Sequence, residues 1–203
     1  MSGKMLVDHE LVEAIRTKTI GLTNFDLDSI DITSSNCPIQ ASSLDLSVGE
    51  IYFPTSKKMD EEHTLRGETG YRLAAGDSIV IETLEELSLK ENISGICFPP
   101  ARLARDGLLM TNPGHIDPGF SGKLTFTLIN FGREECSLRK GDPISTFLFF
   151  DLGPGAQVPY NERLPKTEPK SGKIPRILNK LSPDFANFSE RAENAANLLR
   201  SIY

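Results

Sequence analysis

The sequence has few cysteines, no long basic run and no apolar run that approaches the length of a membrane helix. Cys37, Cys97 and Cys136 are widely spaced and odd in number, which is typical of reduced thiols in a cytosolic protein. Because Cys-x-x-Cys and His-x-Glu pairs are absent, the sequence offers no zinc site of those types. Without a membrane helix or the apolar stretch of a signal peptide, we expect a cytoplasmic protein with no membrane partner.

The charge is modestly negative, at −6 over 203 residues. A nucleic-acid backbone is therefore not expected as a partner, and an anion would need a local basic pocket. The apolar fraction of 38% suits a soluble chain with a substantial core. We expect one domain over residues 1–152, because the composition changes after Leu152.

Beyond Leu152 the chain is rich in proline, glycine and lysine. The segment 153–175 contains five prolines, and we predict an extended arm over residues 153–180. Its lysines, Lys166, Lys170 and Lys173, either cover a bound anion or are plain solvating charge. Residues 181–203 predict an amphipathic helix that docks on the body or on a neighbouring subunit. Its apolar stripe comprises Phe185, Phe188, Ala192, Ala195, Leu198, Leu199 and Ile202.

Before Leu152, alternating apolar residues and turn signals predict an all-β domain with flanking helices. A short helix is expected over Val7–Arg16, with Asp8 as its N-cap. Residues 55–71 predict an exposed excursion. Glu82, Glu85 and Glu86 are expected to form a solvated rim rather than a metal site. Strands are expected within 41–53, 73–89 (two strands around a turn at 75–77), 92–98, 124–130, 136–138 and 144–152.

The most informative stretch is Thr111–Asn130, a turn-rich segment followed by an alternating strand. His115 and Asp117 lie inside the turn. Ionisable groups on a stiff loop are well placed to meet a ligand, because loops on a rigid scaffold often carry function. A tight surface turn with solvated side chains explains the same residues, so both interpretations stay open here.

Arg102 and Arg105 are the best phosphate-binding candidates. They lie in Ala101–Gly107, which predicts a helical turn, and a guanidinium group matches the geometry of phosphate oxygens. The backbone N–H groups at the start of that turn would add to the attraction. The alternative is that both arginines form surface ion pairs with carboxylates.

Four segments in register resemble the dCTP deaminase and dUTPase superfamily, especially its deaminase branch. The central one is Ile116–Gly122 (Ile-Asp-Pro-Gly-Phe-Ser-Gly), followed by a strand that ends at Asn130. The resemblance implies a distorted β-barrel, jelly-roll-like in form (a dUTPase-like β-clip), and a homotrimer with its sites between subunits. The other three segments are Ala41–Gly49 (Ala-Ser-Ser-Leu-Asp-Leu-Ser-Val-Gly), Leu103–Leu108 (Leu-Ala-Arg-Asp-Gly-Leu) and Gly141–Ile144 (Gly-Asp-Pro-Ile).

The resemblance also implies a ligand, a pyrimidine deoxynucleoside triphosphate, and a reaction, zinc-independent deamination of dCTP to dUTP. Asp117 would contact the sugar, and the backbone near Asn112–His115 the base. Catalysis would use Asp117 with His115, and any Mg²⁺ would be carried by the triphosphate. The nucleotide-binding residues implied are Arg102, Arg105, Asn112, Asp117 and Phe120.

Three positions depart from the family pattern. The catalytic glutamate of the family's non-metal deaminases falls on Thr127, whose hydroxyl cannot act as a base near neutral pH. A binding serine falls on Ala101, and an arginine falls on Pro100. A carboxylate from elsewhere, for example Glu134 or Glu135 of a neighbour, would restore the chemistry.

Two alternatives to deamination therefore stay open. One is a catalytically inactive trimer that binds a nucleotide or serves as an assembly module. The other is a dUTPase-like diphosphatase in which Asp117 orients the attacking water. The Arg-Ser-Gly and glycine-rich motifs usual in dUTPases are not matched here.

Overall fold

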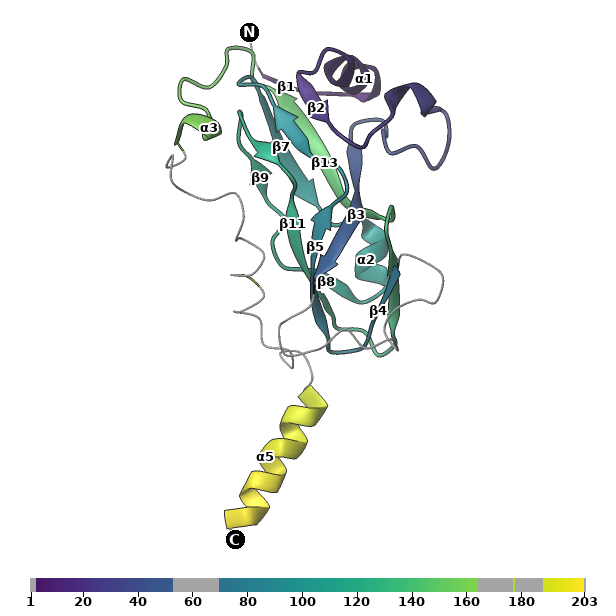
Figure 1. The fold of residues 1–203 in the computed structure, drawn as a ribbon, viewed down its shortest axis with the longest axis vertical. Coiled ribbons are helices and arrows are strands. Elements are labelled where there is room, and N and C mark those ends of the chain that lie inside the picture. The colour runs from purple at the N-terminus through teal and green to yellow at the C-terminus, as the bar shows by residue number, and fades with distance from the viewer. Residues whose placement is uncertain (1–2, 53–69, 164–176, 178–187, 203) are drawn as a thin grey trace.

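The chain forms one long curled β-sheet, two small sheets and short helices, seen in a computed structural model that describes residues 3–52, 70–163, 177 and 188–202. The strand order of the main sheet is β8-β11-β5-β3-β13-β7-β9, and β1 pairs with β13 (Figure 1). Its strands are β1 (Lys4–Met5), β3 (Leu44–Tyr52), β5 (Ser78–Thr83), β7 (Ile93–Phe98), β8 (Leu108–Met110), β9 (His115–Ile116), β11 (Thr125–Asn130) and β13 (Pro143–Asp151).

The small sheets and the helices surround this sheet. One small sheet has the order β10-β6-β2, and the other pairs β12 with β4. These strands are β2 (Ile20–Leu22), β4 (Gly70–Leu73), β6 (Leu87–Leu89), β10 (Ser121–Gly122) and β12 (Cys136–Arg139). The helices are α1 (Asp8–Arg16), η1 (Leu27–Ser29), α2 (Ala101–Arg105), α3 (Tyr160–Arg163) and α5 (Phe188–Ile202), and none described is long and apolar enough to cross a membrane.

The expected all-β fold with flanking helices is confirmed, and the strands arise where the sequence alternates. In β7, for example, Ile93, Gly95 and Cys97 face inward while Ile96 and Phe98 are exposed. The stacked pair Phe147 and Phe149 of β13 has no exposed surface and anchors the core. Every strand pair in these sheets is antiparallel, and no two paired strands are consecutive among the described elements, so each pairing joins segments that are distant in the sequence.

The N-terminal helix starts at Asp8, the residue predicted as its cap. Val7 is the N-cap of α1, and its backbone N–H donates to the Glu10 carboxylate at 3.2 Å. The prediction of Asp8 as N-cap was wrong, because a glutamate three residues after Val7 returns to satisfy that N–H. Leu11 and Ile15 are buried, as an amphipathic helix requires.

The C-terminal part agrees only in part with the prediction. The segment 153–163 contains a four-residue helix, α3, so it is not fully extended. Residues 164–176, 178–187 and residues 55–69 of the predicted excursion over 55–71 lie outside the part of the chain that the structure describes. The last two residues of that prediction, Gly70 and Tyr71, belong to β4, and Tyr71 is buried. Leu198 and Leu199 of α5 are 64% and 59% exposed, so this helix does not dock on the body of its own chain. Docking on a neighbouring subunit stays a prediction.

Asn130 ties the end of β11 to two neighbouring segments. Its side-chain N–H group donates to the carbonyls of Leu73 and Glu134, both at 2.9 Å, and its side-chain oxygen accepts from Gly132 N–H at 2.8 Å. The side chain is fully buried. One amide therefore satisfies three backbone groups that would otherwise lose their partners away from water.

We predict that Asn130→Ala lowers the free energy of unfolding by about 2–4 kcal/mol, since unsatisfied buried groups are left behind. Urea unfolding followed by circular dichroism measures the change. Asn197→Ala, an exposed asparagine of α5, is the control and should change stability by less than about 0.5 kcal/mol. Equal stabilities of the two variants would contradict the role assigned to Asn130.

Asp45 is a half-buried carboxyl on β3. It accepts a hydrogen bond from the Thr146 hydroxyl at 2.6 Å. Burial raises the pKa of Asp45 above its ordinary value of 3.8, although the Thr146 hydrogen bond partly opposes the shift. These contacts give Asp45 a structural role between β3 and β13.

The raised pKa gives a pH-dependent prediction. The folded state favours the neutral carboxyl, so this contribution is complete below the unfolded pKa and is lost as the pH rises through the folded pKa. Asp45→Asn should therefore stabilise the protein at neutral pH by up to about 1 kcal/mol and have little effect at about pH 3. Urea titrations at both pH values test this, with exposed Asp28→Asn as the control. A stability gain at low pH instead would refute it.

Candidate functional site

The turn that carries Asp117 is held by glycine and by the segment that follows β13. Gly119 has φ +80°, and a Cβ there would lie 2.7 Å from Pro159 Cβ. Tyr160 N–H donates to the Pro118 carbonyl at 2.8 Å. The ring centroids of Phe120 and Tyr160 are 5.7 Å apart. Residues far apart in the sequence thus seat α3 on the Asp-Pro-Gly turn.

His115 and Asp117 come together on the surface beside this turn. His115 Nε2 lies 3.6 Å from Asp117 Oδ1, and their side chains are 75% and 53% exposed. Both are open to a ligand. The same exposure also fits a solvated turn, so the contact places the two groups together without choosing between the two interpretations.

Asn112 binds backbone within its own chain. Its side-chain N–H group donates to the Thr125 carbonyl at 2.7 Å, and its oxygen accepts from Thr127 N–H at 3.0 Å. The Thr111 N–H extends the ladder to the Thr127 carbonyl. The Asn112 amide therefore continues the pairing of β8 with β11. Asn112 was predicted to bind a nucleotide, and this structural role was not foreseen.

The loop between β8 and β9 is held on its other side by Cys97. Gly114 N–H donates to Cys97 Sγ at 3.2 Å, and Cys97 N–H donates to the Gly114 carbonyl at 2.8 Å. Burial raises the pKa of the Cys97 thiol, so the thiol is less acidic than usual. Both backbone groups of Gly114 are occupied, which removes them from the set expected to contact a base.

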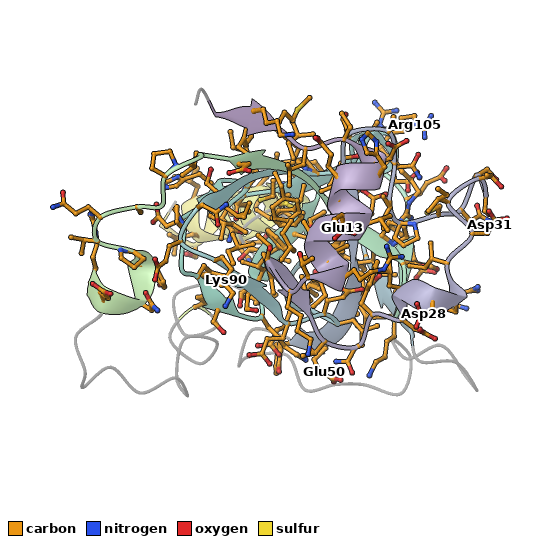
Figure 2. All side chains as sticks on the ribbon, turned by 90° about the horizontal axis from the view of Figure 1, so that it is seen from above. Glu13, Asp28, Asp31, Glu50, Lys90 and Arg105 are labelled. Carbon is orange, nitrogen blue, oxygen red and sulfur yellow. The ribbon has the colours of Figure 1, made fainter. Side chains whose placement is uncertain are left out.

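The two arginines of α2 differ in their environments. Arg102 donates to the Pro143 carbonyl at 3.2 Å and lies 3.7 Å from Asp106, so it forms the surface ion pair foreseen as the alternative. Arg105 makes no ion pair or side-chain hydrogen bond with any residue that the structure describes. Figure 2 shows Arg105 at the periphery, on the opposite edge from Glu50. A ligand can reach it without breaking a contact.

Thr127 lies on the outer face of β11 and β5, the side that does not contribute to the main core cluster. In β11 the core residues are Phe126 and Leu128, so Thr127 points the opposite way. Its cross-strand partner is Val80, which is buried yet outside the core cluster. Thr127 itself is only 7% exposed.

A carboxylate that the sequence assigned only to an acidic rim lies on this outer face. Glu82 pairs directly with Thr125 across β5 and β11, two positions from Thr127 on the same side. Lys123 Nζ is 3.9 Å from Glu82 Oε2, and the Glu82 side chain is 22% exposed. The strand register reveals that Glu82 lies on the same face as Thr127. A single sequence does not show which strands pair, so it does not show this register.

The predicted acidic rim is only partly correct. Glu86 is exposed and Glu82 half-buried, but Glu85 is 3% exposed and accepts from Ser47 N–H at 2.8 Å. Glu85 therefore fixes β3 rather than facing solvent. Among the described residues, no group of three or more His, Cys, Asp or Glu side chains could hold a metal ion.

Glu134 and Glu135, considered as replacements for the missing glutamate, lie beyond the end of β11. Both are exposed, and Glu135 pairs with Arg72 at 3.4 Å. Two surface hollows have volumes of about 450 and 620 Å³, the first along α1 and the second between β2, η1 and β6, and neither is lined by Arg105, Asp117 or Thr127. Arg105 and Asp117 are exposed in one chain, whereas Thr127 is buried.

Known proteins resemble this chain over most of its length. Residues 5–152 match the family described as dCTP deaminase-like. The dUMP-forming dCTP deaminase of Salinispora arenicola is 28% identical over 170 residues, which cover 77% of this chain and 84% of that protein. The dCTP deaminase of Actinobacillus pleuropneumoniae serotype 5b is 32% identical over 115 residues, which cover 56% of this chain and 59% of that protein.

A solved structure supports the fold. The 2'-deoxycytidine 5'-triphosphate deaminase of Agrobacterium tumefaciens superposes with a TM-score of 0.57 at 17% identity, over 74% of this chain. The match covers 49% of that structure, so this chain spans about half its length. At this identity the likeness concerns the fold alone. Because the family match covers well over half of the residues, the chain belongs to the dCTP deaminase-like family, within the dCTP deaminase and dUTPase superfamily.

Proposed function

We propose that this protein binds a pyrimidine deoxynucleoside triphosphate and deaminates dCTP to dUTP. The observation that carries the proposal is the Asp-Pro-Gly turn, with exposed Asp117 and His115 on a rigid support, in a chain of the dCTP deaminase-like family. A pre-organised turn lowers the entropic cost of holding a ligand. No metal-ligand set is required, because a carboxylate can move the protons of a hydrolytic deamination.

Each candidate residue has a role that its position allows. Asp117 would accept hydrogen bonds from the sugar, and Phe120 would shape the turn beneath it. Arg105 would bind the triphosphate, since its guanidinium group is exposed and has no ion pair among the described residues. Mg²⁺ would be carried by the triphosphate oxygens rather than by protein ligands.

The proposed site lies between subunits of a homotrimer. Ile96 and Phe98 on β7 are 37% and 47% exposed, and Ile96 is the cross-strand partner of His115. An apolar surface beside a candidate site fits a subunit contact.

The second candidate function is nucleotide binding without turnover. Thr127 favours it, because a buried hydroxyl stands where the family's non-metal deaminases have a glutamate. Ala101 also favours nucleotide binding without turnover, since it lacks the hydroxyl of the family's serine. The protein would then have kept the fold and the ligand but lost the reaction.

We expect the purified protein with Mg²⁺ to release ammonia from dCTP and not from dATP or dGTP. Ammonia, pyrophosphate and nucleotide products should be followed together, with thermal shift in parallel. Stabilisation by dCTP without ammonia would support the second candidate. Pyrophosphate from dUTP without ammonia from dCTP would indicate diphosphatase chemistry, and no response to any nucleotide would overturn the proposal.

We predict that Arg105→Ala weakens dCTP binding by about 10–100-fold, because one charge-assisted phosphate contact is lost. Titration calorimetry on the full chain measures the affinity. Arg16→Ala is the matched control, since Arg16 is an exposed arginine paired with Glu13 at 3.5 Å. Unchanged affinity in Arg105→Ala would remove Arg105 from the site.

A further inference from the structure

The outer face of β11 and β5 carries a polar row beside the position of the missing glutamate. Antiparallel register aligns Thr125 with Glu82, Thr127 with Val80 and Ile129 with Ser78. Directly opposed residues point to the same side of a sheet, so Glu82 and Thr127 share this face as diagonal neighbours. Diagonal neighbours are about 7–8 Å apart, within reach of a long side chain.

Glu82 is the carboxylate on this face closest in register to Thr127. Its side chain is 22% exposed, so it is partly withdrawn from water yet still accessible. Lys123, three residues before Phe126, lies 3.9 Å from it and restricts its orientation. Burial, followed by the negative charges of Glu82 and Glu50, raises the pKa of Tyr52, whose cross-strand partner is Val80. Glu82 is therefore close enough to Tyr52, the neighbour of Val80 on β3, for its charge to act there.

The same face contains a buried hydroxyl without a partner. Ser78 Oγ makes no hydrogen bond to any described residue, and Ser78 is only 7% exposed. Native proteins rarely leave such a group unsatisfied, so a polar partner is expected at this surface. Thr127 lies between Glu82 and Ser78 in the register. The row thus combines a proton acceptor with hydroxyls that can bind water or a polar ligand.

The geometry points to Glu82, on the neighbouring strand β5, as the general acid/base of the deamination. Glu82 would perform the task that a glutamate at position 127 of β11 performs in the family's non-metal deaminases. This inference rests on the proposed function and adds the residue that moves the protons. Glu82 on β5 and Thr127 on β11 face the same side of the sheet, and the Thr127 side chain is shorter than that of a glutamate. Because β11 and β5 pair in this register, a glutamate on β5 can replace a glutamate on β11.

The reaction balances without another reactant. The carboxylate of Glu82 removes a proton from water, and the water oxygen forms a bond to C4 of cytosine. The C4–N bond to the amine breaks, and the water oxygen becomes the new carbonyl oxygen. One water proton ends on N3 and the other leaves on the amine, so dCTP and water give dUTP and ammonia.

A structural interpretation of Glu82 makes a different prediction. If Glu82 serves only as the partner of Lys123, Glu82→Gln lowers the melting temperature and leaves the rate per folded molecule unchanged. Glu50 offers a matched control, because it is also a glutamate paired with a lysine, Lys140, at 3.2 Å. The two variants lose the same charge and the same kind of ion pair.

The test measures single-turnover ammonia release from dCTP and dCTP affinity in the full chain. Glu82→Gln should slow the chemical step by at least about 100-fold, while affinity changes by less than about threefold. Glu50→Gln should keep the rate. Adding Thr127→Glu to the Glu82→Gln variant should restore at least about a tenth of the rate, because it returns a carboxylate to the same space.

The outcomes separate this inference from the proposed function. If the unaltered protein deaminates dCTP and Glu82→Gln does so equally well, the assignment of Glu82 is wrong and the proposed function stands. If the protein binds dCTP but releases no ammonia, both the assignment of Glu82 and the proposed deamination are wrong, and the proposed nucleotide binding is supported. If dCTP does not bind, the proposed function itself falls. Loss of rate in both glutamine variants also contradicts a specific role for Glu82.

Discussion

The pairing of β11 with β5 is the constraint on which the rest of the structure depends. Thr125 to Ile129 pair with Glu82 to Ser78 without a break, which sends Phe126 and Leu128 into the core. A shift of one residue would exchange the two faces and place Thr127 in the core cluster instead of Leu128. Such a slip would cost the burial of several large apolar side chains, so the register is strongly specified.

The ends of β11 are secured by side-chain amides. Asn112 extends the ladder near Thr127, and Asn130 closes the strand by binding backbone groups of Leu73, Gly132 and Glu134. These contacts replace backbone partners where the regular ladder stops, so they keep buried polar groups satisfied. They also explain why two polar side chains in a candidate site region serve the fold first.

The candidate site combines a rigid turn with exposed charges. Gly119 allows α3 to pack against the turn, and Cys97 holds the loop before it. His115 and Asp117 then project from a support that already has its conformation before any ligand arrives. The positive charge for a phosphate lies elsewhere, on Arg105 of α2 (Figure 2). A single chain thus presents the acidic and the basic candidate groups on separate elements, Asp117 in the turn between β9 and β10 and Arg105 on α2.

The sequence by itself determined the family, the β-rich fold and most strand positions, because the Asp-Pro-Gly motif, the turn residues and the alternating patterns are local features. It also located Thr127 at the glutamate position. Only the tertiary structure decided that Asn112 and Arg102 bind their own chain, that Glu85 is buried and that Glu82 lies beside Thr127. Those facts depend on which strands pair and in what register, and pairing joins residues that are distant in the sequence, where a local pattern carries no information.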